Sequence, residues 1–598
     1  MEKRTLLAVV LSLIVILIYQ YYFVPVPPKP LLNGDKNISE TTIEDKKASP
    51  SPDLHSTALD KTNKLSGPMK KDLIELLENQ KKEKPRNITI ETSKYRALIN
   101  TENAMITSWK LKDYVLTRDY ENIPWKMSFW KMVGNAYKSY FIGLAESKTD
   151  SEEKENIDLF QSPDAIKGNG LQIIAGDLSR EGIQGNENPY QSVFLTKSAE
   201  NIILDSDHPQ KTLKLKYIMP NGFQVEKTFT FFNDTYKIDV DILTTNISDH
   251  TDTLDYTLLI GSGLGNAFQK GAHKFEGPVT WLNGKKIKDK PGKNSNTIQH
   301  QGNISWTSMT SNYFVAAAIP QREESEVIIS RPEMDTKDAT SINKSTMIGI
   351  HYPARELAPN AAEKDSYSFY LGPKKYKTLE NFGINLEQVV DYGFFSFLAK
   401  PLIWLLNWFY KWIPNYGIAI IVLTILIKIV FWPLTDKSFR SMKEMQDLQP
   451  KLSALREKYK SDPKKLNEEL MNMYKQKGVN PMGGCLPLLL QIPVFFALYE
   501  GLLVSIELRG APFIFWIKDL SVMDPLLITP ILMGITMYAQ QKMTPMTGDA
   551  AQVKMMMMMP LIFTVFFLGF PSGLVIYWLL NNILTVGQHY LILKKMNA

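Results

Sequence analysis

The sequence predicts a polytopic α-helical membrane protein that also carries a large all-β domain. Three observations lead to this prediction. An apolar run of spanning length opens the 598-residue chain. Five more such runs follow in its last third, at about 416–433, 484–504, 525–541, 555–570 and 574–593. Between these two ends, apolar and polar residues alternate as they do in β-strands.

The first apolar run predicts a transmembrane anchor over residues 1–24. Lys3 and Arg4 precede the run, and tyrosines that suit a membrane interface close it. A cleavable signal peptide is the alternative, but no small-x-small cleavage pattern precedes the proline-rich stretch 25–30. Residues 25–86 are rich in Pro, Ser, Asp and Lys and poor in aromatic residues, which is typical of a flexible linker.

Residues 87–375 predict a β-sandwich. Leu213, Leu215 and Tyr217 lie at alternate positions, Asn221 and Gly222 form a hairpin signal, and the alternation resumes after it. A β domain of this size is expected to consist of two packed sheets rather than one small barrel.

The positions of basic residues predict the topology. Region 376–415 holds Lys400 and Pro401 within an apolar, aromatic stretch, which is typical of an interfacial amphipathic helix rather than a span. A span at 416–433, a cytoplasmic helical hairpin at 434–483, and four spans with a short basic tail at 484–598 then follow. This gives six spans with both termini and the basic segments in the cytoplasm, and the β domain in the periplasm. A seventh span at 392–412 would place the basic segments outside.

Lys428 is the strongest candidate for a functional residue. It lies in a predicted span, with Thr424 one helical turn before it. Two interpretations are open: the side chain snorkels to the headgroups, or it faces a water-filled cavity between the helices. Gln491 lies between Pro487 and Pro493, a pattern that fits either a hydrated interior or simple packing kinks. The basic hairpin is either a solvated surface or a contact site for an acidic partner such as ribosomal RNA.

Signatures of catalysis are missing from the sequence. It contains no H-E-x-x-H, no G-x-x-x-x-G-K-[ST] and no G-x-S-x-G. The one cysteine, Cys485, has no second cysteine or nearby histidine with which to hold a metal ion. We therefore expect no metal, no cofactor and no enzymatic activity.

Several short blocks resemble the YidC family of bacterial membrane protein insertases, in its Gram-negative form with a large periplasmic domain. The resemblance covers essentially the whole chain apart from the linker. The blocks are VDYG at 390–393, WPLT at 432–435, LQPK at 448–451, NPMGGC at 480–485, ELR at 507–509 and FPSGL at 570–574.

The resemblance implies an insertase and chaperone of the inner membrane, in which five spans surround a hydrophilic groove open to the cytoplasm and to lipid. Lys428 occupies the position of the groove cation, usually arginine, and Thr424 and Gln491 join it in the groove. The substrate would slide along Ile492, Phe495, Phe566 and Trp578, where Ile492 and Trp578 replace an expected methionine and tyrosine. Implied partners are nascent membrane proteins, the Sec translocon, the lipid bilayer, and ribosome and signal-recognition components at the hairpin and tail.

Two other classes of function stay open on the residues alone. A solute transporter or channel would need a path continuous to both sides and often shows internal repeats, and none is visible here. The β domain could instead bind carbohydrate, because sandwiches of this size resemble sugar-binding folds.

Overall fold

The computed structural model describes residues 78, 80, 82–115, 156–160, 171–175, 193–219, 222–261, 263–267, 275–290, 297–322, 324–330, 346–459, 462–477, 486–543 and 550–597. The predicted anchor at 1–24 and most of the predicted linker lie outside these residues.

The β domain consists of two sheets, antiparallel except for the parallel pair β1–β6, that share one long strand, β14 (Thr297–Thr310). Its first half pairs with β16, and its second half pairs with β12 and β15. Gly302, with φ +141°, lies close to the change of partner. The first sheet contains β1 (Asn87–Glu91), β2 (Tyr95–Asn100), β3 (Met105–Val115), β4 (Asn156–Asp158), β5 (Leu171–Ala175), β6 (Asn201–Ile203), β11 (Tyr256–Ile260), β16 (Glu324–Ser330) and β17 (Met347–His351).

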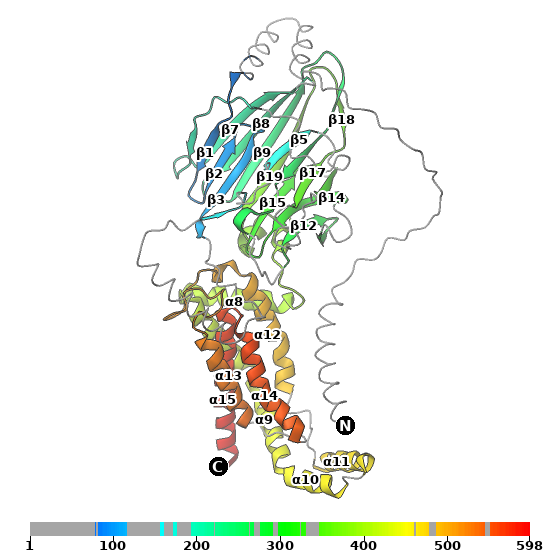
Figure 1. Cartoon of the computed structure of the whole chain (residues 1–598), viewed down its shortest axis with the longest axis vertical. Helices are drawn as coiled ribbons and strands as arrows, with labels where there is room; N and C mark the ends of the chain where they lie inside the picture. The colour runs from blue at the N-terminus through cyan, green and yellow to red at the C-terminus, as the bar shows by residue number, and fades with distance from the viewer. Residues whose placement is uncertain are drawn as a thin grey trace, which may run out of the picture. The chain divides into compact units, whose positions relative to one another are not determined.

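The second sheet runs, from edge to edge, through β7, β8, β9, β19, β15, β14, β12 and β13 (Figure 1). Its further strands are β7 (Gln210–Ile218), β8 (Phe223–Phe232), β9 (Lys237–Asn246), β12 (Gly277–Leu282), β13 (Lys285–Lys288), β15 (Phe314–Pro320) and β19 (Ala362–Pro373). The predicted hairpin between β7 and β8 is confirmed, and Gly222 adopts φ +91° beside it. A small separate pair joins β10 (Asp252–Leu254) to β18 (Arg355–Leu357).

The two sheets face each other across an aromatic core. Every second residue of β8 is buried, as the alternation predicts. Trp109 of the first sheet donates its indole N–H to the carbonyl of Leu371 in the second sheet at 2.9 Å. Tyr95 stacks on Trp109 with 3.8 Å between ring centroids. The core therefore draws its side chains from both sheets, as in a sandwich.

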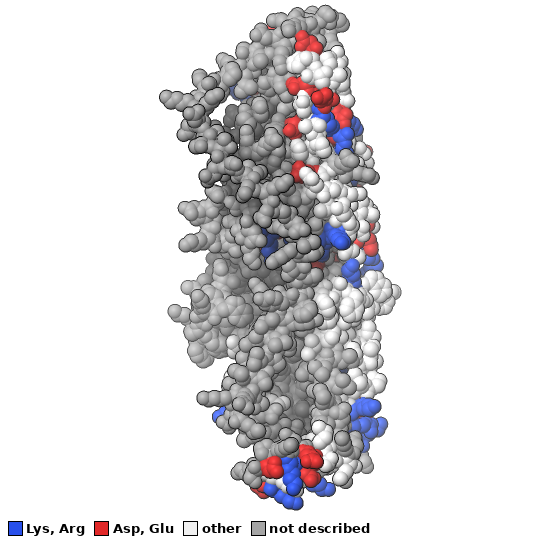
Figure 2. Space-filling model, turned by 90° about the vertical axis from the view of Figure 1, so that its right-hand side faces the viewer, with Lys and Arg blue, Asp and Glu red and all other residues white. Residues whose placement is uncertain are grey.

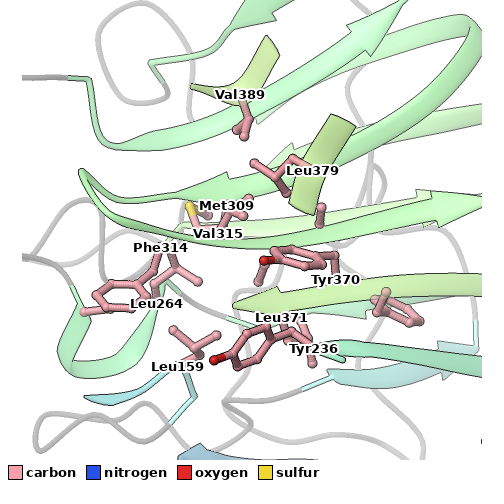
Figure 3. Close-up of a cluster of buried hydrophobic side chains, with 14 of the residues drawn as sticks. Leu159, Tyr236, Leu264, Met309, Phe314, Val315, Tyr370, Leu371, Leu379 and Val389 are labelled. Atoms are coloured by element: carbon pink, nitrogen blue, oxygen red, sulfur yellow. The ribbon is translucent and has the colours of Figure 1, made fainter. Parts of the chain in front are cut away.

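Two short helices extend this core beyond the last strand. Leu379 lies in α7 (Tyr376–Glu380) and Val389 in the 3₁₀ helix η2 (Leu386–Val389), and both are buried. Figure 3 shows them beside strand residues such as Val315 and Tyr370. The segment up to Val389 is therefore anchored in the β domain.

The helical part begins with α8 (Ser396–Trp412), which lies within the predicted interfacial region. Figure 1 shows α9 (Tyr416–Asp447), α12 (Leu486–Val504), α13 (Ile528–Met543) and α15 (Ser572–Asn597) running side by side. The residues of α14 (Ala550–Phe567) up to Met559 belong to a different compact unit. From Pro560 onward α14 meets α13, where a Cβ on Gly534 would lie only 1.9 Å from the Thr564 hydroxyl oxygen.

Helix α9 begins at a side-chain cap and continues beyond the predicted end of its span. Asn415 accepts a hydrogen bond from the Ile418 N–H at 3.1 Å. The helix does not stop at Pro433, and Thr435 donates to the Phe431 carbonyl at 2.9 Å just past it. Among the described residues α9 is the one helix that is long and apolar enough to cross a membrane by length and composition. The count of six spans stays a prediction.

The predicted cytoplasmic hairpin contains α10 (Gln449–Lys458) and α11 (Pro463–Lys477). Asp462 caps α11 by accepting from the Lys465 N–H at 3.1 Å, directly before Pro463. Met445, Leu448 and Leu452 form a small buried cluster, and side chains of α11 pack against it. The apolar side chains of α11 therefore pack against those at the start of α10.

Two hydrogen bonds link the β domain to the segment at the C-terminal end of α12. The Asn312 side-chain amide, in the turn between β14 and β15, donates to the Leu503 carbonyl at 3.0 Å. Arg509 donates to the Val115 carbonyl at 2.7 Å, and its guanidinium lies 5.4 Å from the centre of the Phe314 ring. The carbonyls in the last turn of a helix have no hydrogen-bond donor within the helix, and here Asn312 supplies a donor to one of them.

Candidate functional site

Lys428 points toward another helix. Its ammonium donates to the Thr585 hydroxyl of α15 at 2.6 Å, and that hydroxyl donates in turn to the Asn581 carbonyl at 2.6 Å. The side chain of Lys428 is only partly exposed. This geometry favours the interpretation of Lys428 as a cation inside the helix bundle over a snorkelling side chain.

Thr585 is part of a polar stripe on α15. Asn582 and Thr585 are three residues apart, and Gln588 and His589 follow Thr585 by three and four residues; all four are buried. Together with Lys428 they form what we call the polar seam. Because most neighbouring positions of α15 are apolar, the stripe marks the side of the helix that meets protein rather than lipid.

The seam runs along α9 and α15 in parallel. The Gln588 side-chain amide donates to the Trp432 carbonyl at 3.4 Å, and the His589 ring stacks on Phe439 with 4.3 Å between centroids. The contacts thus run from the Lys428–Thr585 pair to the Phe439–His589 pair, with residue numbers rising along both helices. The two helices are therefore parallel.

Several polar atoms of the seam are buried without a partner in the described part of the chain. These atoms are Nδ2 of Asn582, Oε1 of Gln588 and Nδ1 of His589. Buried polar atoms in proteins are normally satisfied, by protein groups or by water. The seam therefore offers hydrogen bonds to polar groups that enter between the helices.

Thr424 and Gln491 lie at different places relative to the seam. Thr424 is buried one turn before Lys428, and its hydroxyl donates to the Ile420 carbonyl of its own helix at 2.6 Å. Gln491 lies near the start of α12, half-buried, and its side chain lies near the Tyr577 hydroxyl of α15. That hydroxyl has no hydrogen bond of good geometry to a described residue.

The predicted slide residues gather around an aromatic cluster. The Phe495 ring of α12 meets Trp578 of α15 edge-on, with 4.6 Å between centroids. Phe567 of α14 lies 5.4 Å from Trp578 and 5.6 Å from Phe566. Ile492 lies one turn before Phe495, and the side chains of Ile492 and Phe566 are exposed. The cluster thus connects a buried aromatic core to an outward-facing apolar surface.

The members of the seam on α15 were not predicted from the sequence. Their signal was present in the spacing of Asn582, Thr585 and Gln588, which places polar side chains on one helical face within an apolar run. Which helix that face would meet depends on how α15 is rotated in the bundle, and spacing does not specify this rotation.

The outer faces of the bundle are apolar. Exposed aliphatic side chains occur on α9, α12, α13, α14 and α15, and Val430 is 65% exposed. Figure 2 shows a nearly uncharged band on the described surface, with charged side chains gathered beyond it. An apolar surface of this extent marks contact with lipid or with other apolar surfaces. The further examples are Ile429, Ile535, Leu561, Ile562 and Leu591.

Two family models match the chain. The model of the 60Kd inner membrane protein matches residues 408–598, and the model of the YidC periplasmic domain matches residues 147–405. The two matches together cover the β domain from residue 147 onward and the helical part, and they meet within α8.

Curated relatives match the whole chain or about two thirds of it. The membrane protein insertase YidC of Syntrophus aciditrophicus (strain SB) is 38% identical over 598 residues, which is 100% of both chains. That of Geobacter sp. (strain M21) is 43% identical over 393 residues, or 65% of this chain and 72% of the relative. A crystal structure of an active YidC insertase covers 84% of this chain and 92% of its own, at 17% identity and a TM-score of 0.34. On the strength of the full-length relative, the chain belongs to the YidC family of membrane protein insertases.

Proposed function

We propose that this chain inserts integral proteins into a bacterial inner membrane and helps them fold, with the polar seam as part of a hydrophilic groove. The observation that carries the proposal is the inward contact of Lys428 with Thr585, next to the aromatic cluster around Phe495 and Trp578. In this proposal the groove opens to the cytoplasm and to lipid, and Thr424 and Gln491 line it. Family membership supports the same function.

The physical chemistry of the task matches these two surfaces. A polar tail that crosses a dry bilayer loses several kcal/mol for each group that stays unpaired. The seam offers such a tail a cation and buried hydrogen-bonding groups, so acidic tails are favoured. The apolar part of the substrate leaves along Ile492 and Phe566, whose side chains face outward. Partitioning into lipid drives this step, so no nucleotide hydrolysis is required.

We further propose six spans, of which five form the insertase core, with both termini in the cytoplasm and the β domain in the periplasm. The distribution of basic residues supports this topology, because it places Lys3, Arg4, the 434–483 hairpin and the basic tail on one side. The slide consists of Ile492, Phe495, Phe566 and Trp578 in this arrangement.

The partners proposed for the chain are nascent membrane proteins, the Sec translocon, and ribosome and signal-recognition components. Exposed charged residues on α10 and α11 support a cytoplasmic contact, because these helices carry lysines and glutamates on their outer faces. The chain would act either alone or beside the translocon.

Reconstitution tests the proposal. The purified full chain is placed in proteoliposomes, and insertion of a small two-span protein with an acidic tail is measured by protease protection. The proposal predicts insertion that is strongly reduced by Lys428→Ala and preserved by Lys428→Arg, since arginine keeps the charge. Insertion at the rate of empty liposomes would disprove the function, and normal insertion by Lys428→Ala would remove Lys428 from it.

A carbohydrate-binding role for the β domain is a second candidate. A surface pocket of about 400 Å³ lies where β14 and β15 meet the loop after α7. Polar side chains predominate at its wall together with Phe382, an arrangement that suits polyhydroxylated ligands. Binding of glycans by the full chain, abolished by Arg322→Ala, would support this role. The polar lining residues are Lys237, Asn303, Ser305, Gln321, Arg322 and Ser368.

A further inference from the structure

Lysines from three separate elements converge around Asp391, which directly follows the β domain. Lys286 of β13 donates to the Gln388 carbonyl at 3.0 Å and lies 3.7 Å from the Asp391 carboxylate. Lys288 of the same strand forms an ion pair with that carboxylate. β13 is the edge strand of its sheet, so its outer side is not covered by another described strand.

Two more lysines join from neighbouring segments. Lys374, which follows β19, is buried and donates to the Ser311 carbonyl at 3.0 Å. Lys400 of α8 lies with its ammonium 5.4 Å from the centre of the Tyr376 ring. Lys290 lies just after β13. Its ammonium lies 5.9 Å from the centre of the Phe275 ring, and the ammonium of Lys288 lies 5.6 Å from the same ring centre. We call Lys286, Lys288, Lys290, Lys374 and Lys400 the junction lysines.

Several junction lysines lie close enough together to interact electrostatically. Burial lowers the pKa of Lys286; Asp391 opposes this effect, whereas Lys288 and Lys400 add to it. Burial also lowers the pKa of Lys374 to about 7, with Asp391 and Glu276 opposing and Lys286 and Lys288 adding. The ammonium groups are thus close enough to repel one another. An anion at this place would relieve that repulsion.

α8 places this charge at the surface of the membrane. Ala399, Leu402, Ile403 and Leu406 are buried, and Ile403 lies against Gly501 of α12. The opposite face of α8 exposes aromatic rings, with Lys400 and Lys411 at its edge. Aromatic rings of this kind sit at the level of lipid headgroups, and helices with such a face lie along the interface. The exposed rings are Phe397, Trp404, Trp408 and Trp412.

We propose that three of the junction lysines, the accessible Lys288, Lys290 and Lys400, bind the phosphate headgroups of anionic phospholipids in the leaflet that α8 touches. The exposed aromatic face of α8 requires lipid beside it, and lipid phosphates are the anions fixed at that depth. Because β13, which carries Lys288, belongs to the β domain, bound headgroups also hold the β domain against the membrane surface. This inference rests on the proposed topology, in which α8 lies at the periplasmic surface.

Site-resolved amine labelling of the full chain tests this proposal. The chain is placed in nanodiscs of phosphatidylcholine alone, or of phosphatidylcholine with phosphatidylglycerol, and acetylation of each lysine is followed by mass spectrometry. Labelling of Lys288, Lys290 and Lys400 should slow about fivefold with phosphatidylglycerol, since a lysine near an anionic surface gains about 1 kcal/mol. Equal labelling in the two lipids would overturn the proposal.

The chain supplies matched controls. Lys197, Lys211 and Lys214 lie on or near β7, at the opposite edge of the same sheet from β13, and their labelling should not change. Slowing there as well would show a nonspecific effect and overturn the assignment of a site. Inorganic phosphate added to phosphatidylcholine discs should leave labelling unchanged, and protection by phosphate alone would contradict a lipid ligand.

A variant separates a cooperative site from independent charges. Lys400→Gln should restore fast labelling of Lys288 and Lys290 in phosphatidylglycerol discs, whereas Lys400→Arg should keep them protected; no difference between the two variants would contradict a shared headgroup. Insertion by the same preparations is measured in parallel. A chain that inserts its substrate but shows no protection overturns the lipid site while the proposed function stands.

Discussion

The hydrogen bond from Lys428 to Thr585 connects the one cation of the seam to α15. Thr585→Val keeps the size of the side chain but removes the hydroxyl that accepts this bond. A hydrogen bond to a charged group contributes about 1.5–3 kcal/mol, so we expect insertion of an acidic-tailed substrate to slow about tenfold. The initial rate of insertion into proteoliposomes measures this effect. Thr585→Ser, which keeps the hydroxyl, should insert normally, and an unchanged rate for the valine variant would refute the role of the contact.

Lys227 is a second residue whose environment makes a measurable prediction. Its ammonium is buried between the sheets, where it donates to the Asn103 carbonyl at 2.8 Å and lies 4.7 Å from the centre of the Phe194 ring. Burial lowers its pKa from 10.5 to about 7. Between these two values the unfolded chain binds more protons than the folded chain, so the free energy of unfolding rises with pH across this window.

Replacing Lys227 by methionine should remove this pH dependence. Lys227→Met keeps the length of the side chain and avoids a buried charge, so the β domain should gain about 1–4 kcal/mol at pH 7. Hydrogen exchange at the amides of β8 in the full chain, corrected for intrinsic rates at each pH, reports the change. Lys214→Met, at an exposed position of β7, is the control. A steeper pH dependence in the Lys227 variant would contradict the argument.

At the scale of elements, the turn between β14 and β15 holds the end of α12. Asn312→Ala leaves the Leu503 carbonyl without its buried donor, which costs about 1–3 kcal/mol. We expect amides in the last turn of α12 to exchange hydrogen about tenfold faster, since about 1.4 kcal/mol corresponds to that factor. Hydrogen exchange of the full chain in detergent measures this. The exposed Asn303 of β14 is the control, and equal effects of Asn303→Ala and Asn312→Ala would disprove a specific link.

Elements that pair with their neighbours along the chain could be predicted from the sequence. Features that depend on contacts between residues far apart in the chain could not. The β7–β8–β9 meander follows from alternation and from the glycine at position 222, because neighbouring strands pair through short turns. The continuation of α9 past Pro433 was not predicted, because a proline after a tryptophan also fits the end of a span. Lys428 and Thr585 are 157 positions apart in the chain and lie on different helices. The periodicity within either helix does not specify that they meet.

At the scale of the whole molecule, charge is the feature that relates the parts to the membrane. Basic residues flank the apolar runs near Lys3, Lys465 and Lys595, whereas the β domain carries both signs. This distribution predicted a common side for the termini and the hairpin. It did not predict the hydrogen bonds that join the β domain to the end of α12. In the sequence, Asn312 looks like any other polar turn residue, and only the pairing of β14 with β15 places it beside α12.

Cysteine accessibility tests the topology of the whole chain. In a Cys485→Ser background, single cysteines replace Lys3, Lys290, Lys465 or Lys595, and a membrane-impermeant maleimide is added to spheroplasts. Six spans require that only Lys290→Cys reacts in intact spheroplasts, while the other three react after the membrane is opened. Because both termini share a side only when the number of spans is even, reaction of the Lys3 and Lys595 variants on opposite sides would exclude six spans. Protection of the Lys290 variant would place the β domain and the junction lysines in the cytoplasm.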